Sequence, residues 1–297
     1  MPSGRLPDRL LFWGPTLIWA STWHAILYQL ASDVPVLNSV AWRFGLAALG
    51  LFAIARWQGA SLRLPLSAHV LTLATGIVQY SGNYWSVYQA ERYIPSGLVA
   101  VLFSLMVFGN ALSGHFVFGQ SVTRRFLLAA SVGVGGVVMI FWPEIAATGA
   151  RPTALLGLGL GLLAVLAACI GNVLTLTLTR RSLALVPILA WSMGYGALFL
   201  ILLSQASGVG LHFDWRPGYV LSLLYLALFG SVTAFVLYFK MAQRHGPARA
   251  ALTGVVIPVI ALVISAVFEG WQPTTLSVAG MALCLGSLYA ATRPALT

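Results

Sequence analysis

Ten apolar segments, each long enough to cross a lipid bilayer, constrain this chain more than any other feature. They lie at residues 10–30, 36–56, 70–90, 96–118, 125–142, 153–179, 184–204, 218–239, 247–268 and 274–292. About 20 apolar residues in a helix span the hydrocarbon core of a membrane. Only 7% of the residues are charged, whereas soluble proteins have about a quarter. The sequence therefore predicts an all-α integral membrane protein with ten transmembrane helices and no soluble domain.

The positions of Arg and Lys predict how these helices are oriented. Cytoplasmic loops of membrane proteins carry an excess of both residues. If the N terminus is cytoplasmic, 12 of the 16 Arg and Lys residues fall on the cytoplasmic side. The four on the outer side are Arg43, Arg92, Arg151 and Arg216. We therefore expect both termini to be cytoplasmic.

The same charges argue against a nucleic-acid partner, although the net charge is +10. Nucleic-acid binding needs basic residues clustered on one face, and here they are scattered between apolar runs. Cys169 and Cys284 both lie inside apolar segments, which favours packing over a disulfide or a metal site.

The sequence motifs of common enzyme classes are absent: the chain contains no HExxH, no GxSxG and no intramembrane Asp pair. We expect no enzyme activity, no metal and no cofactor, with an intramembrane enzyme, a lipid-binding scaffold and a channel as the alternatives.

Three local matches indicate an internal repeat. AWRFGLAAL at 41–49 matches AWSMGYGAL at 190–198, AERYIP at 90–95 matches AQRHGP at 242–247, and GQSVT at 119–123 matches GWQPT at 270–274. The separations are 149, 152 and 151 residues. The chain therefore divides into residues 1–149 and 150–297, with five helices in each half. Because five is odd, the second half enters the membrane from the opposite side, which is the inverted repeat of many alternating-access transporters.

These motifs also resemble the drug/metabolite transporter superfamily, in its ten-helix EamA-type branch. The resemblance covers essentially the whole chain and is carried by WASTW at 19–23, AWRF at 41–44, QAERYIPSGLVAVLFSL at 89–105 and SVGVGGVVMIF at 131–141. Within the superfamily, the sequence most resembles the YddG-type bacterial exporters of aromatic and other amino acids. The resemblance implies a multi-pass protein of the bacterial inner membrane that moves small metabolites out of the cell.

Two positions depart from the pattern of that family. Its fourth and ninth helices often carry a central proline, but Pro258 in the ninth helix here aligns with Met106 in the fourth. The family's Gly-Glu pair at the end of the fourth helix is replaced by Gly119-Gln120, while Glu269 remains at the end of the ninth. We therefore expect the first half to bend less at Met106.

A polar aromatic stripe is the first candidate for a binding surface. Tyr80, Asn83, Tyr84, Val87 and Tyr88 share one helical face, since they are three or four residues apart. Rings with hydroxyl and amide tips suit a ligand that has an apolar body and a few hydrogen-bonding groups. The alternative is that these residues belong to the interfacial aromatic belt or pack against neighbouring residues. We favour a cavity for Tyr80 and Asn83, because polarity deep in a membrane is costly.

Other candidate substrate-binding residues come from neighbouring segments. Segment 10–30 offers Trp19, Trp23 and His24, and His24 could either bind substrate or hydrogen-bond to a backbone carbonyl. Three further candidates are Asn110, Asn172 and Thr233. Asparagine also joins transmembrane helices by hydrogen bonds, and this role is favoured for Asn110 and Asn172.

Arg43 and Pro258 have separate interpretations. Arg43 lies several residues inside the outer end of segment 36–56, where it could bind a substrate carboxylate or pair with Asp33 or Glu91. We favour a structural ion pair, the usual state of a charge near a membrane edge. Pro258 removes a backbone hydrogen bond within a helix and is either a hinge for alternating access or a static kink.

The positions of the acidic residues bear on coupling to ions. Each acid lies in a loop or at a helix end, so the sequence predicts no buried carboxylate of the kind that proton relays need. We expect a monomeric, lipid-embedded carrier that is facilitative, with a proton-coupled exporter as the alternative. The aromatic stripe and the family resemblance both point to small amphipathic metabolites, foremost amino acids, including aromatic ones. Export is implied by the resemblance alone.

Overall fold

The computed structural model describes residues 7–119, 123–147, 152–181, 183–245 and 253–292. Within these residues every regular element is a helix. The elements are α1 (Asp8–Leu30), α2 (Val36–Trp57), α3 (Leu66–Thr75), η1 (Gly76–Asn83), α4 (Tyr84–Ala90), α5 (Ser96–Ser104), α6 (Met106–Phe118), α7 (Arg124–Ala147), α8 (Pro152–Thr179), α9 (Leu185–Ala206), α10 (Pro217–Leu224), η2 (Tyr225–Thr233), α11 (Ala234–His245), α13 (Thr253–Phe268) and α14 (Thr275–Thr292). The all-helical prediction is confirmed for the described residues.

Six helical runs are long and apolar enough to span a membrane by length and composition. They are Val36–Trp57, Ser96–Val117, Arg124–Pro143, Pro152–Thr179, Leu185–Ala206 and Pro217–Arg244, and two shorter apolar helices cover Val256–Phe268 and Thr275–Ser287. The number of membrane crossings and their orientation remain predictions. The expected boundary between halves, at residues 149 and 150, lies outside the described residues, as do Gln120 and the first residues of the predicted segment 247–268.

Proline and glycine mark where many of these helices begin and end. Pro7, Pro35, Pro65 and Pro95 each directly precede a helix. Proline has no backbone N–H, and the N–H groups at the start of a helix have no partner within the helix, so proline costs nothing there. Helices α2, α6, α9 and α13 are each followed within two residues by a glycine of positive φ; these glycines are Gly59, Gly119, Gly208 and Gly270. Such a left-handed residue is a common way to end a helix.

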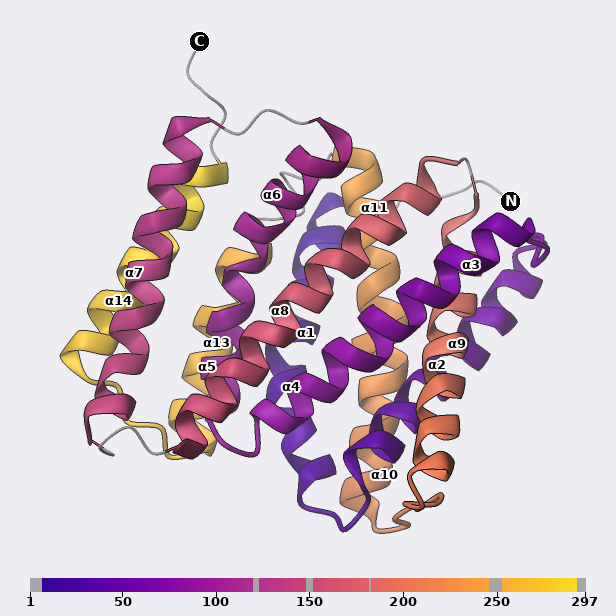
Figure 1. Cartoon of the computed structure of the whole chain (residues 1–297), viewed down its shortest axis with the longest axis horizontal. Coiled ribbons are helices and arrows are strands. Elements are labelled where there is room, and N and C mark those ends of the chain that lie inside the picture. The colour runs from indigo at the N-terminus through magenta and orange to yellow at the C-terminus, as the bar shows by residue number, and fades with distance from the viewer. Residues whose placement is uncertain (1–6, 120–122, 148–151, 182, 246–252, 293–297) are drawn as a thin grey trace.

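Two tightly packed helix pairs form the edges of the molecule, α2 with α9 and α7 with α14 (Figure 1). The second pair relies on small residues. Gly136 of α7 and Gly280 of α14 face each other so closely that a Cβ atom on either would approach the other's carbonyl oxygen to 2.6 Å. Small residues at such crossings let transmembrane helices approach each other.

The helices between these pairs meet at a common core, and both described chain ends lie at one end of the bundle (Figure 1). We call this end, where α1 begins and α14 ends, the terminal face. The opposite end is the far face, and it carries the turn between α4 and α5 and the connection from α13 to α14.

Two π-helical segments and one break interrupt the regular α-helices. The segments η1 and η2 begin at Gly76 and Tyr225, 149 residues apart. The side-chain hydroxyl groups of Ser81 and Ser231 donate hydrogen bonds to carbonyls five residues earlier, Gly76 and Leu226, at 3.1 and 3.0 Å. Such π-segments are rare and frequently accompany functional sites.

The break at Leu105 corrects the expectation for Met106. Helix α5 ends at Ser104 and α6 begins at Met106, so the half without the proline is interrupted here. By contrast, α13 continues through Pro258 without interruption. The amides of Leu105 and Phe108 bond to carbonyls three residues earlier, the tighter pattern that marks a local change of helix geometry.

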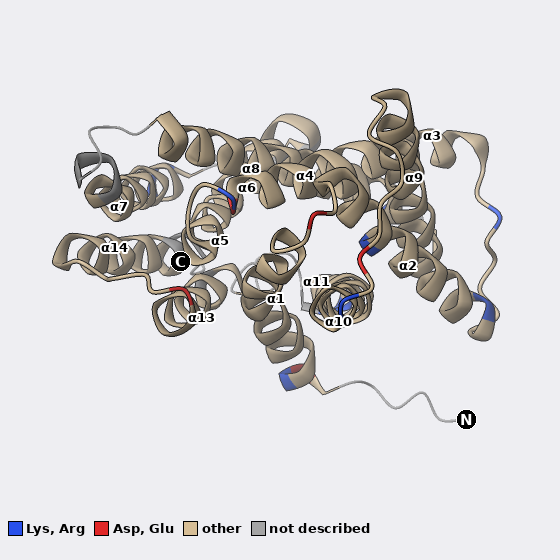
Figure 2. Cartoon of the chain, turned by 90° about the horizontal axis from the view of Figure 1, so that it is seen from below, with Lys and Arg blue, Asp and Glu red and all other residues tan. Residues whose placement is uncertain are grey.

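Charged residues gather at helix ends and connections, as Figure 2 shows from below. Two acids nevertheless have buried side chains. Glu91, in the turn between α4 and α5, is 7% exposed, and the side chain of Glu269 is 8% exposed. The prediction that no carboxylate is buried is therefore wrong. The connections at the far face fold against neighbouring helices. A residue that lies between two helices in the sequence is therefore buried in the structure.

Candidate functional site

A cavity lies in the middle of the bundle, between residues of both halves of the chain. Its empty space is about 960 Å³, including solvent at the opening. The lining residues are Trp19, Thr22, Trp23, Ile26, Arg43, Gln79, Asn83, Tyr84, Val87, Ala100, Phe103, Ser104, Met106, Val107, Asn110, Ala168, Asn172, Phe235, Tyr238, Thr253, Gly254, Ile257 and Pro258. Apolar walls with a few polar groups are typical of sites for small organic ligands.

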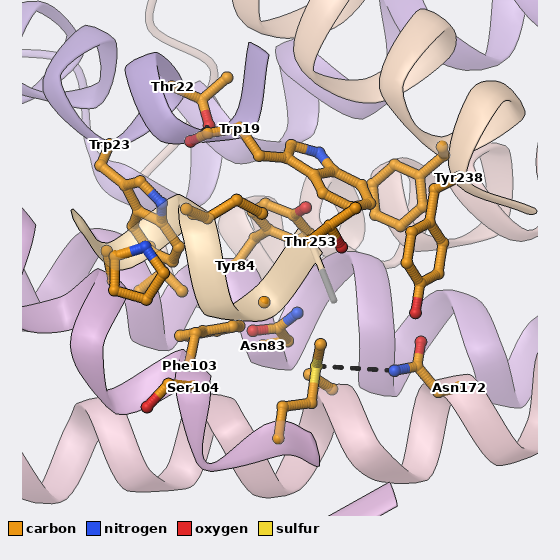
Figure 3. A pocket seen from close by; sticks show the side chains of 18 of the residues that line it. Trp19, Thr22, Trp23, Asn83, Tyr84, Phe103, Ser104, Asn172, Tyr238 and Thr253 are labelled. Atoms are coloured by element: carbon orange, nitrogen blue, oxygen red, sulfur yellow. Dashed lines mark hydrogen bonds between the residues drawn. The ribbon is translucent and has the colours of Figure 1, made fainter. Parts of the chain in front are cut away.

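Aromatic rings form much of the wall. Trp19 contacts Phe235 and Tyr238, with ring centroids 5.2 Å apart in both pairs. Trp23 contacts Phe103 at 5.0 Å. Figure 3 shows Trp23 and Phe103 at one end of the cavity and Tyr238 at the other. These contacts fix the rings before any ligand enters, so apolar surface can be buried on binding with little ordering of the wall.

Amide groups supply the polar part of the lining. Asn83 is 2% exposed and its Oδ1 has no hydrogen-bond partner. The Oε1 of Gln79 also lacks one. In α8, which packs against η1, the amide of Asn172 donates to Asn110 at 3.3 Å and to the sulfur of Met106 at 3.6 Å (Figure 3). This contact joins α6 to α8, and both Asn110 and Asn172 also line the cavity, so their favoured structural role stays a prediction.

Arg43 lines the cavity without the predicted ion pair. Its Nε donates to the hydroxyl oxygen of Ser231 at 3.1 Å, and its Cζ lies 4.5 Å from the ring centroid of Tyr84. No salt bridge joins it to Asp33 or Glu91. The prediction that Arg43 forms a structural ion pair is therefore wrong. Glu91 is buried, and neither of its carboxylate oxygens has a hydrogen-bond partner.

The two π-segments position these groups. Segment η1 carries Gln79 and ends at Asn83. In η2, the carbonyl of Gly230 accepts the indole Nε1–H of Trp19 at 3.1 Å, and the adjacent Ser231 binds Arg43. Each π-segment therefore places polar groups, or backbone acceptors that hold lining residues, beside the cavity. The carbonyls that a π-segment leaves outside the α-helical pattern are available for such contacts.

Exposure changes along the length of the cavity. The lining residues toward the far face, Ile26, Arg43, Val87 and Ala100, are at most 2% exposed. Those toward the terminal face, Asn110, Asn172 and Tyr238, are only partly buried. The lining is thus fully buried toward the far face and less completely buried toward the terminal face.

A hydrogen-bonded cluster closes the far face. Glu269, next to the end of α13, accepts the backbone amide of Ser96 at 3.1 Å and the Ser96 hydroxyl at 2.5 Å. Its Oε1 also lies 3.1 Å from Nδ1 of His24. The hydroxyl oxygen of Ser265 accepts the amide of Gly97 at 2.8 Å. Helices α1, α5 and α13 are therefore joined at this end.

Three predicted binding residues lie outside the cavity. Tyr80 is fully buried between the rings of Phe44 and Phe235, at 5.1 and 5.7 Å. His24 belongs to the far-face cluster. The hydroxyl of Thr233 donates to the carbonyl of Leu228. Trp19, Trp23, Asn83, Tyr84, Asn110, Asn172 and Pro258 do line it.

Several lining residues were not predicted, among them Gln79, Phe103, Ser104, Tyr238 and Thr253. Gln79 is four residues before Asn83 and so shares its helical face, a signal available in the sequence. Phe103 and Ser104 had no such signal, since they lie within an almost continuous apolar run. Among the described residues, no group of three His, Cys, Asp or Glu side chains could hold a metal ion.

Comparison with known proteins places the chain in a sequence family. The EamA-like transporter family matches it twice, over residues 9–142 and 155–293. A probable amino-acid metabolite efflux pump of Salmonella typhimurium is 26% identical over 284 residues, covering 92% of this chain and 90% of that protein. Its counterpart in Escherichia coli strain K12 is 23% identical over 282 residues, with the same coverage of both chains.

More distant similarities agree with these. A WAT1-related chloroplastic protein of Arabidopsis thaliana is 24% identical over 288 residues, covering 94% of this chain and 68% of that protein. One solved crystal structure superposes with a TM-score of 0.71 at 18% identity and covers 96% of both chains. At that identity the structural likeness concerns the fold.

Proposed function

This chain belongs to the EamA-like transporter family, a family of membrane transporters rather than enzymes, and on that premise we propose that it exports small amphipathic metabolites by alternating access. The solutes are foremost amino acids, including aromatic ones, and the location is the bacterial inner membrane. The observation that carries the proposal is the central cavity, with aromatic walls and unpartnered amide and guanidinium groups. The names of the Salmonella and E. coli relatives support amino-acid metabolites and efflux.

The arrangement of the cavity supports alternating access. Its lining is fully buried toward the far face and less completely buried toward the terminal face, as expected for a carrier resting in one of its two end states. The cytoplasmic bias of Arg and Lys supports a cytoplasmic terminal face. A solute would then enter from the cytoplasm and leave when the contacts of α1, α5 and α13 at the far face separate.

Internal symmetry supports a carrier built from two inverted halves of five helices each. The family matches the chain in two consecutive stretches. The π-segments recur 149 residues apart, and the helix-ending glycines Gly59 and Gly208 do so as well. The pairs α2–α9 and α7–α14 each join helices that correspond under this repeat. In such transporters the halves rock against each other around a site near the bilayer midplane.

Counterflow in proteoliposomes tests this function. Purified protein is reconstituted with each of a panel of unlabelled amino acids and nucleobases inside, and uptake of the labelled solute is followed. A carrier gives transient accumulation that saturates with concentration, whereas a channel gives neither saturation nor counterflow. Absence of flux for every solute would contradict the proposal and favour a scaffold.

A second candidate, proton-coupled export, is favoured by the buried acids Glu91 and Glu269. Burial raises the pKa of Glu91 well above its usual value, the nearby Glu269 raises it further, and Arg43 opposes both. Buried ionisable groups in membrane proteins commonly mark proton pathways. An imposed pH gradient that changes initial flux several-fold would support coupling, and an unchanged flux would support the facilitative carrier.

A further inference from the structure

We propose that Arg43 anchors the carboxylate of the transported solute, so that the carrier selects amino acids and similar small carboxylates over analogues in which that group is neutral. This inference rests on the proposed carrier function and assigns one residue of its cavity a specific role. The relevant chemistry is the recognition of a carboxylate by a planar guanidinium.

The first observation is a buried cation whose charge has no direct partner. Arg43 is 1% exposed, and its Nη1 has no hydrogen-bond partner. An unpaired buried charge is among the costliest arrangements in a protein interior. Functional sites are where such a cost is tolerated, since a ligand can remove it. Arg43 also lines the central cavity, so its side chain borders the space that an entering anion would occupy.

The neighbouring acids do not satisfy this charge. Glu91 has two unpartnered carboxylate oxygens, so it makes no hydrogen bond with Arg43. Glu269 is occupied by Ser96 and His24. Asp33 is exposed and forms no salt bridge with Arg43. No acid in the described residues therefore competes by direct contact for the free side of the guanidinium.

The second observation is that the guanidinium is held in place before a ligand arrives. The hydroxyl of Ser231 donates to the carbonyl of Leu226 at 3.0 Å, and its oxygen is then oriented to accept Nε–H of Arg43. The ring of Tyr84 packs against the guanidinium at 4.5 Å, a cation–π contact. Nε is thus occupied, while Nη1 remains to donate. A fixed donor loses little entropy when it binds.

The third observation is an acceptor for the other charged group of an amino acid. Oδ1 of Asn83 is buried, unpartnered and in the lining of the same cavity. An ammonium group carries only donors and could satisfy it. The rings of Trp23 and Phe103 provide apolar surface for a side chain. The cavity therefore offers a donor for carboxylate, an acceptor for ammonium and an apolar wall, which together match a zwitterionic amino acid.

The test compares acids with amides of the same shape. Labelled L-phenylalanine counterflow is measured in proteoliposomes of the full-length protein, with unlabelled L-phenylalanine or L-phenylalaninamide as competitor. The L-leucine and L-leucinamide pair is tested in the same way. If Arg43 forms a charged hydrogen bond with the carboxylate, the wild type should bind each amino acid about 10- to 100-fold more tightly than its amide.

Variants of Arg43 then assign this preference to one residue. Arg43→Gln should bring the acid-to-amide ratio to within about threefold of one, because a neutral amide lacks the charge that favours the acid. Arg43→Lys keeps the charge but loses the planar fork and should fall between. Arg216→Gln is the matched control, since that arginine is exposed and pairs with Asp214 on the far face; it should retain the wild-type ratio.

Each outcome decides between the anchor and an alternative. A wild type that accepts acid and amide equally, or an Arg43→Gln carrier that keeps the acid preference, would overturn the anchor while leaving carrier function intact. Flux limited to solutes without a carboxylate would do the same. If no solute gives counterflow, the carrier function fails, and the anchor fails with it. Should Arg43→Gln not fold, the wild-type ratio and Arg43→Lys still decide.

Discussion

Glu269 binds the first turn of helix α5 through Ser96, accepting both its backbone amide and its hydroxyl. The contact places a carboxylate at a helix N terminus, where partial positive charge favours an anion. It joins the residue that follows α13 to the first residue of α5 at the far face. A carrier that releases solute at this face must break it.

Weakening this contact should open the far face. Glu269→Gln removes the charge that the start of α5 stabilises, which is worth about 0.3–1 kcal/mol at such a position and more when partly buried. We expect Ile26→Cys, introduced in a Cys169→Ser, Cys284→Ser background, to react several-fold faster with a membrane-impermeant thiol reagent in intact cells. Asp33→Asn changes an exposed acid of the same face and is the control. An unchanged labelling rate would show that Glu269 does not hold the far face closed.

Asn83 and Tyr80 should behave differently despite lying on one helix face in the sequence. Asn83→Ala removes a lining amide, so the apparent KM for counterflow of L-phenylalanine should rise about 2- to 10-fold, the equivalent of one hydrogen bond. Tyr80→Phe removes a hydroxyl that has no partner and lies outside the cavity, so KM should stay unchanged. The reverse pattern would place the binding surface on the other side of this helix.

Glu91 should make stability depend on pH. Because burial raises the pKa of Glu91 in the folded protein, stability is highest below the unfolded-state pKa of about 4.3 and declines as pH rises through the folded-state value. Glu91→Gln cannot ionise and avoids this loss. We expect its Tm in detergent to exceed the wild-type Tm, by a margin that grows from about pH 5 to about pH 8. A margin independent of pH would contradict burial as the cause.

Two adjacent glycines of α7 offer a matched test of packing. Gly136→Val adds atoms where the backbone of α14 is already in contact, whereas Gly135→Val has open space, with nothing within 4 Å of the added Cβ. Overpacking of this kind costs about 1–3 kcal/mol. Gly136→Val should therefore lower the Tm in detergent, and Gly135→Val should change it little. Equal effects would mean that helix propensity, not the α7–α14 contact, determines the outcome.

The positions of the helices could be predicted from sequence because their signals are local. Apolar runs of the required length, prolines such as Pro95 before a helix and glycines such as Gly119 after one each depend only on neighbouring residues. The π-segments have no comparable signal. A change from α- to π-helix does not alter the apolar composition of a segment. The sequence of η2 therefore could not be distinguished from that of the α-helix around it.

The site was predicted less completely because it depends on which helix faces meet. Trp19 and Asn83 line the cavity, whereas Tyr80 packs in the core between two phenylalanine rings. The surroundings of Arg43 and Glu91 depend on contacts between residues far apart in the chain. A charged residue near a membrane edge usually pairs with an opposite charge or contacts water. Only the structure shows that Arg43 instead packs against η2 and Tyr84 and has no acidic partner.

Locking the far face tests the central claim, alternating access through this cavity, most directly. Cysteines replace His24 and Glu269 in a background without Cys169 and Cys284, and a short bifunctional thiol reagent with a reducible linker joins α1 to α13. Counterflow of L-phenylalanine is measured before cross-linking, after it and after reduction, with each single-cysteine protein as control. We predict that cross-linking abolishes counterflow in the double variant alone and that reduction restores it. Undiminished counterflow in the fully cross-linked protein would contradict the account.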